Sequence, residues 1–126
     1  MIPLYSDEND KQPYWFEDGK AYIQHRFKET RPHYLTTLAA LEVCNLATEY
    51  NLYIKWYEGG ILHEKDGAKS YEPRDSWINS YAGIHSVKSI EEARNNNLAA
   101  LMVIKEDIDE GYTAFSIQLE KIADEL

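Results

Sequence analysis

The sequence predicts an α+β fold, in which a small antiparallel sheet of hairpins packs against one amphipathic helix, followed by a C-terminal helix or helical hairpin. β-Prone runs separated by glycine turns over residues 52–71 predict the sheet, and helix-period apolar residues over 31–50 predict the first helix. A capping box at Ser89 predicts that residues 89–126 form the second helical part. The 126 residues suit a single domain, with residues 1–12 as a flexible arm.

The first expected element is a β-hairpin over residues 14–23. The aromatic run 14–16 is followed by Asp18-Gly19 and by a second β-prone run that reaches Ile23. Asp-Gly between apolar runs is a strong hairpin signal, because both residues tolerate positive φ.

An amphipathic helix of about 18 residues is expected next, opened by Thr30-Arg31-Pro32 and ended by Asn51. Its apolar face consists of Leu35, Ala39, Val43, Leu46, Ala47 and Tyr50. The single cysteine, Cys44, lies at the edge of that face, which is more typical of core packing than of a nucleophile.

Three short strands should form a meander after this helix, at residues 52–57, 61–64 and 68–71. Gly59-Gly60 and Asp66-Gly67 are the predicted turns between them. Residues 73–84 then form a predicted loop, which its aromatic residues should hold against the domain.

The C-terminal part begins with a capping box, Ser89 to Glu92. The run 98–104 is apolar all round and should be buried, whereas the asparagines 95–97 weaken the helix. A heptad-like stripe follows, made of Leu98, Leu101, Ile108, Tyr112, Phe115, Leu119, Ile122 and Leu126. Either one long helix covered by a partner chain or a hairpin bent near Gly111 fits this stripe.

Charge and composition narrow the functional classes. The net charge of −9, from 22 acidic and 13 basic groups, argues against a protein that grips nucleic-acid phosphates. It is compatible with binding to a basic protein surface or with simple solubility, and the ten tyrosines suit either interfaces or half-buried strands. The chain shows neither a membrane-length apolar run nor a signal-peptide pattern, and one cysteine permits no intrachain disulfide, so a cytoplasmic protein is predicted.

No motif predicts catalysis, a metal or a cofactor. His63-Glu64 begins like a zinc-protease motif, but Gly67 stands where the second histidine is required. The four histidines lie far apart in sequence, and no glycine-rich loop links a strand to a helix for nucleotide binding.

A protein-interaction site is predicted at two places, and it combines aromatic, arginine and acidic side chains. Its residues are Tyr71, Glu72, Arg74, Asp75, Trp77 and Tyr81 in the loop region, with Glu106, Asp107, Asp109 and Glu110 farther along. The alternative is a loop pinned by Trp77, in which Arg74 pairs with Glu72 or Asp75 at the surface.

Part of the chain resembles the small NinX-type accessory proteins of lambdoid phages. The matching residues are Tyr71, Pro73 and Trp77, then Leu98, Ala100, Leu101 and Met102. About half the chain is covered, the Gly-Gly-Pro that follows the loop in that family is missing, and the N-terminal aromatic segment and the acidic end have no counterpart. The resemblance implies a phage or mobile-element accessory protein, and it carries over no catalytic residue.

The leading functional hypothesis is a non-enzymatic factor that binds and inhibits or modulates a host protein, such as a nucleic-acid-binding or defence protein, by covering a basic site. One alternative is a structural or regulatory homodimer formed through residues 98–126. Another is a small-molecule-binding domain or enzyme with a pocket between the sheet and the first helix.

Overall fold

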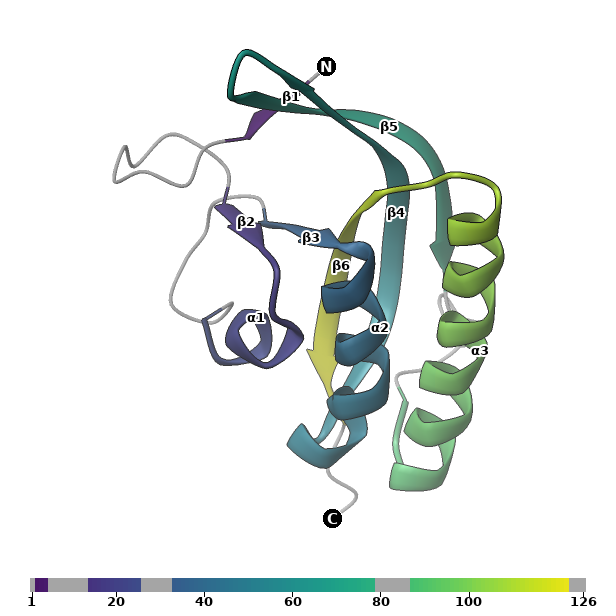
Figure 1. The fold of residues 1–126 in the computed structure, drawn as a ribbon. Coiled ribbons are helices and arrows are strands. Elements are labelled where there is room, and N and C mark those ends of the chain that lie inside the picture. Colours follow the sequence, from purple (N-terminus) through teal and green to yellow (C-terminus); the bar gives the residue numbers. More distant parts are fainter. Residues whose placement is uncertain (1, 5–13, 26–32, 79–86, 123–126) are drawn as a thin grey trace.

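The computed structural model describes residues 2–4, 14–25, 33–78 and 87–122, and confirms the α+β class. Within these residues one six-stranded sheet has the order β1-β5-β4-β6-β3-β2, in which only the β2–β3 pair is parallel (Figure 1). The strands are β1 Ile2–Leu4, β2 Tyr14–Phe16, β3 His33–Thr36, β4 Leu52–Lys65, β5 Ala68–Ile78 and β6 Ala114–Lys121. The helices are α1 Gly19–His25, α2 Thr37–Leu46, the 3-10 turn η2 Ala47–Tyr50, and α3 Ile90–Asp109.

The main core lies between the sheet and the two longer helices. α2 and α3 cover one face of the sheet, and α1 lies beside α2 (Figure 1). The largest fully buried side chains of this core are Leu35, Val43, Leu52, Ile54, Tyr57, Ile104 and Phe115. The described side chains between α2 and the sheet are buried and packed against one another.

The predicted N-terminal hairpin is wrong. Residues 14–16 do form a strand, but it pairs in parallel with β3, and a helix begins at Gly19. Asp18 is the reason, because its Oδ1 accepts hydrogen bonds from the backbone N–H groups of Lys20 and Ala21 at 2.9 and 3.2 Å. The aspartate thus acts as a helix cap rather than as a turn residue.

The first long helix begins later than predicted. Residues 33–36 form β3, and the Thr36 side chain caps α2 by accepting a hydrogen bond from the Ala39 N–H at 3.0 Å. Its predicted opening, Thr30-Arg31-Pro32, lies outside the described residues. The predicted end is confirmed, because Asn51 has a φ of 59°, the left-handed conformation that terminates a helix.

The strands after α2 are longer than predicted. β4 runs without interruption through Gly59 and Gly60, so the two glycines form no turn. The register with β5 shifts there, because Gly59 pairs with Asp75 and Gly60 with Pro73, which makes Arg74 the extra residue of a bulge in β5. The turn at Asp66-Gly67 is confirmed, with φ values of 54° and 81°. β5 continues to Ile78, so the first half of the predicted loop 73–84 is strand, and its remainder lies outside the described residues.

At the N-terminus, residues 2–4 form β1 and pair with residues 69–71 of β5. This pairing contradicts the flexible-arm prediction for those three residues. The rest of the predicted arm lies outside the described residues.

The capping box at the start of α3 is confirmed. Ser89 Oγ accepts a hydrogen bond from the Glu92 N–H at 3.1 Å, and Glu92 Oε1 accepts one from the Lys88 N–H at 2.9 Å. The helix then continues through the three asparagines to Asp109.

Both alternatives for the chain beyond α3 are wrong. Gly111, with a φ of 103°, ends the helical part as predicted, but the next element is a strand, β6, that lies between β4 and β3. Phe115, Ile117 and Leu119 are buried at every second position, which is the period of a strand. Phe115 and Leu119 also fit a heptad stripe, and that coincidence led to the helical prediction.

Residues 98–104 are not buried all round. Ala100 and Ile104 face the core, whereas Leu98 and Met102 are 54% and 59% exposed. Cys44 is buried in the main core, as its core-packing interpretation predicted, and burial raises the pKa of its thiol to about 12.

Candidate protein-interaction surface

The two halves of the predicted interaction site meet where β5 passes the C-terminal end of α3 (Figure 1). Tyr112, which follows α3, donates a hydrogen bond from its hydroxyl to Asp75 on β5. Tyr57, on β4, donates one to Asp107 Oδ2 at 2.6 Å. These hydrogen bonds bring carboxylates from two distant parts of the chain to one place.

Aromatic rings lie beneath and beside these carboxylates. Trp77 on β5 stacks on the buried ring of Tyr57, with ring centroids 5.8 Å apart and an interplanar angle of 25°. Trp77 and Tyr112 are both half-buried, so each keeps part of its ring in solvent. We call this region the acidic–aromatic surface, and it consists of Asp75, Trp77, Glu106, Asp107, Asp109, Glu110 and Tyr112.

Burial and neighbouring like charges both shift the pKa of a carboxyl group on this surface. Burial raises the pKa of Asp107, and the nearby carboxylates of Asp75 and Glu106 raise it further, while the hydrogen bond from Tyr57 lowers it. The hydrogen bond to Asp75 raises the pKa of Tyr112 to about 12, so this hydroxyl remains a donor at neutral pH. No ion pair among the described residues involves any of the five carboxylates. The surface therefore carries negative charge that a basic partner would neutralise.

Glu72 and Arg74 lie nearby on β5 but are already paired. Glu72 accepts from Arg74 at 2.8 Å and interacts with His63 at the same distance, and these contacts hold the pKa of Glu72 below its usual range. The hydrogen bond with His63 is the larger cause. This is the surface pair of the alternative interpretation, and exposed pairs of this kind contribute little stability.

Tyr71 is excluded from the interaction site because it is fully buried on the opposite face of the sheet. Its hydroxyl donates a hydrogen bond to Glu58 at 2.9 Å. The centroid of its ring lies 4.5 Å from that of the Tyr34 ring. The prediction for Tyr71 is therefore wrong. Tyr81 lies outside the described residues, and its predicted role stays a prediction.

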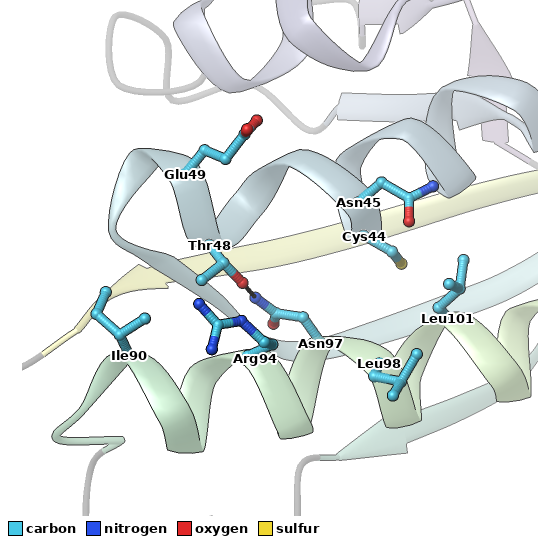
Figure 2. A pocket seen from close by; sticks show the side chains of 9 residues that line it. All are labelled: Cys44, Asn45, Thr48, Glu49, Ile90, Arg94, Asn97, Leu98 and Leu101. Carbon is cyan, nitrogen blue, oxygen red and sulfur yellow. Dashed lines mark hydrogen bonds between the residues drawn. The ribbon is translucent and has the colours of Figure 1, made fainter.

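A pocket of about 490 Å³ lies between the two longer helices rather than between a helix and the sheet. Figure 2 shows Cys44, Asn45 and Thr48 from α2 and η2 facing Arg94, Leu98 and Leu101 from α3. Thr48 accepts a hydrogen bond from Asn97 across it at 3.0 Å. Its lining is mainly apolar and includes no histidine.

The described part of the chain contains neither a metal site nor a membrane-spanning helix. Within it, no group of three or more histidine, cysteine, aspartate or glutamate side chains could hold a metal ion. None of the described helices is long and apolar enough to cross a membrane.

Sequence reasoning missed the contact that Tyr57 makes with the site and assigned Tyr112 only to the apolar stripe. Each tyrosine lies far along the chain from the carboxylate that it contacts. Only the pairing of β4 with β5 and the packing of α3 on the sheet bring these groups together. The excess of tyrosine was the available signal, but it does not specify partners.

Comparisons with known proteins give a consistent pair of relatives. No protein-family model matches the chain. It is 36% identical over 86 residues to two Escherichia coli proteins, "Colicin-E5 immunity protein" and "Colicin-E5 immunity protein in ColE9". The matched part is 68% of this chain and 96% of each relative. The resemblance to NinX-type phage proteins stays a prediction. With nearly the whole of each relative covered, the chain belongs to the colicin-E5 immunity protein family.

Proposed function

We propose that this chain is an immunity-type inhibitor, which binds a protein toxin and blocks it without chemistry of its own. The observation that carries the proposal is the 36% identity to immunity proteins against colicin E5, which spans 96% of their length. The toxin of this chain is then expected to be similar to colicin E5.

The acidic–aromatic surface is the part of the molecule that we assign to the toxin. Five carboxylates that form no ion pair with a described residue favour a basic partner, and they would steer its approach over distances comparable to the Debye length of about 8 Å. Trp77 and Tyr112 supply the rigid aromatic contact area that is typical of binding hot spots. A basic site that holds nucleic-acid phosphates is the complementary surface on the toxin.

Protection of living cells tests the proposal. A colicin-E5-sensitive E. coli strain that expresses the chain should survive colicin E5, as cells expressing that toxin's own immunity protein do. The purified chain should also form a 1:1 complex with the colicin E5 toxin domain. If the chain gives no protection and shows no binding at about 100 μM, the proposal is contradicted. An inhibitor with a dissociation constant above that concentration would bind too weakly to block a toxin.

Competition tests the assignment to a basic toxin site. Heparin, a polyanion, should displace the chain from the toxin domain if the acidic–aromatic surface covers a phosphate-binding site. Unchanged binding in saturating heparin would show that the chain binds the toxin elsewhere.

A further inference from the structure

Gly59, in the middle of β4, lies within the acidic–aromatic surface without contributing a side chain to it. It pairs with Asp75 of β5 on one side and with Phe115 of β6 on the other. It also shares a face of β4 with Tyr57, because residues two apart along a strand point to the same side of the sheet. A side chain at position 59 would therefore stand next to the carboxylate of Asp75.

The ring of Tyr112 occupies the space that such a side chain would need. A Cβ atom at residue 59 would lie 2.7 Å from Cδ2 of Tyr112, and 3.0 and 3.3 Å from Cε1 and Cδ1 of Phe115. Carbon atoms that are not bonded to each other are normally about 3.5–4.0 Å apart. The position of the Tyr112 ring thus depends on a glycine at residue 59.

Hydrogen bonds fix the backbone on both sides of the Tyr112 ring. The N–H of Tyr112 donates to the Asp107 carbonyl oxygen at 3.0 Å, and the N–H of Thr113 donates to the Gly60 carbonyl oxygen at 2.9 Å. The Thr113 Oγ1 accepts a further hydrogen bond from the Leu62 N–H at 2.8 Å. The ring, rather than the backbone, would therefore yield to an added methyl group.

The ring in this position holds a carboxylate of the surface, because the Tyr112 hydroxyl donates a hydrogen bond to Asp75. A side chain that is already held in place loses less conformational freedom when a partner binds. We propose that Gly59 is a positioning residue of the toxin-binding surface, which lets Tyr112 hold Asp75 in the orientation that meets the toxin. This inference rests on the proposed function, since it concerns the same surface.

The affinity for the colicin E5 toxin domain tests this role. Gly59→Ala and Tyr112→Ala should each raise the dissociation constant about tenfold. In the double variant the two effects should not multiply, because the added methyl group has no ring left to displace. Multiplying effects, or an unchanged affinity of Gly59→Ala, would overturn the proposal.

Gly19→Ala is the matched control for the added methyl group. A Cβ at residue 19 would lie 2.6 Å from Glu42 Cβ, so the crowding is comparable. It lies between α1 and α2, away from the C-terminal end of α3 (Figure 1). This variant should change the dissociation constant by less than about threefold. Equal weakening by Gly19→Ala would assign the effect to lost stability and overturn the proposal.

Ionisation of Tyr112 tests the position of its ring without any toxin. The hydrogen bond to Asp75 raises the pKa of Tyr112 to about 12, and Gly59→Ala should lower that pKa toward its ordinary value of 10.0. At about pH 11 the hydroxyl should therefore stay protonated in the unaltered chain and lose its proton in Gly59→Ala. Carbon-13 NMR of ring-labelled tyrosine measures this, with the Tyr112 signal identified by its absence from Tyr112→Phe. An unchanged pKa in Gly59→Ala would overturn the proposal.

Two further outcomes are decided by the same variants. If circular dichroism shows that Gly59→Ala does not fold, adding Tyr112→Ala should restore folding, because it removes the closest contact. Failure to restore folding would overturn the proposal. If the unaltered chain binds no toxin, the proposed function fails, and the ionisation of Tyr112 still decides whether Gly59 positions the ring.

Discussion

Asn97 hydrogen-bonds to backbone groups of β4 on the side away from β6. Among the described residues, the pairing of β5 with β4 reaches only to Trp56, whereas residues 52–54 pair with β6. Asn97 Oδ1 accepts a hydrogen bond from the Ile54 N–H at 2.9 Å, and its Nδ2 donates to the Leu52 carbonyl at 3.1 Å. Two side-chain hydrogen bonds thus satisfy the backbone groups of Leu52 and Ile54. The run of asparagines weakens the helix by propensity alone, but these tertiary contacts outweigh that loss.

Asn97→Ala should therefore lower the free energy of unfolding by about 2–4 kcal/mol, because it leaves buried backbone groups without partners. Asn95→Ala is the control, since Asn95 is exposed on the same helix, and its effect should stay within about 0.5 kcal/mol. Urea denaturation measures both. Equal effects of the two substitutions would show that helix propensity, and not the contact with β4, decides the stability.

Asp107 provides a second test, because its charge is unfavourable in the folded chain. Burial and the neighbouring carboxylates raise the pKa of Asp107 above its ordinary value of 3.8. The folded chain therefore binds more protons than the unfolded chain just above pH 3.8, and this group makes stability fall as pH rises through that window. At neutral pH the penalty is fully present.

Asp107→Asn should stabilise the chain at pH 7, because the amide oxygen still accepts the Tyr57 hydrogen bond while the repulsion disappears. The two proteins should converge in stability as pH falls toward 3.8. Urea titrations at a series of pH values measure the gap. The same substitution should weaken toxin binding, a combination typical of a residue retained for function. A variant that is less stable at pH 7 would contradict this account of Asp107.

At the scale of elements, local signals predicted caps and ends better than they predicted strands. The Ser89 cap, the Asn51 end and the Asp66-Gly67 turn rest on contacts within a few residues, and each is confirmed. β6 could not be predicted, because Phe115 and Leu119 fit both helical and strand periods. Its position between β4 and β3 depends on long-range pairing, which no local pattern reports.

α1 packs closely against α2 at Gly19. A Cβ at Gly19 would lie 2.6 Å from Glu42 Cβ and 2.8 Å from the Ala39 carbonyl oxygen, so the helices approach closely only because residue 19 is glycine. Gly19→Ala should destabilise the chain by about 1–3 kcal/mol through overpacking. Lys20→Ala, at the exposed neighbouring position, is the control and should be nearly neutral. Thermal or urea unfolding of both variants decides the matter, and a neutral Gly19→Ala would show that α1 moves freely to accommodate the methyl group.

At the scale of the whole molecule, sequence reasoning recovered the chemistry of the candidate site but not its assembly. Asp75, Trp77 and the carboxylates of residues 106–110 were predicted as two separate pieces. Their junction depends on Tyr57 and Tyr112, whose contacts require the complete fold. The same fold removes Tyr71 from the surface by turning it toward Tyr34 on the other face of the sheet.

The distribution of charge predicts the kinetics of the proposed association with a toxin. Association with the colicin E5 toxin domain should slow by about tenfold or more as salt rises from about 25 to 500 mM, because screening removes long-range attraction. The dissociation rate should change far less. Stopped-flow mixing measures both rates, and an association rate that is independent of salt would contradict an electrostatically steered encounter.

We assign toxin binding to the acidic–aromatic surface, and two charge-matched pairs of substitutions test that assignment through their affinity for the colicin E5 toxin domain. Asp75→Asn with Asp109→Asn alters this surface, whereas Glu64→Gln with Glu91→Gln removes the same charge from the β4–β5 turn region and the start of α3. The first pair should raise the dissociation constant about tenfold or more, and the second should change it by less than about threefold. Equal weakening by both pairs, or no weakening by the first, would show that toxin binding does not depend on the acidic–aromatic surface.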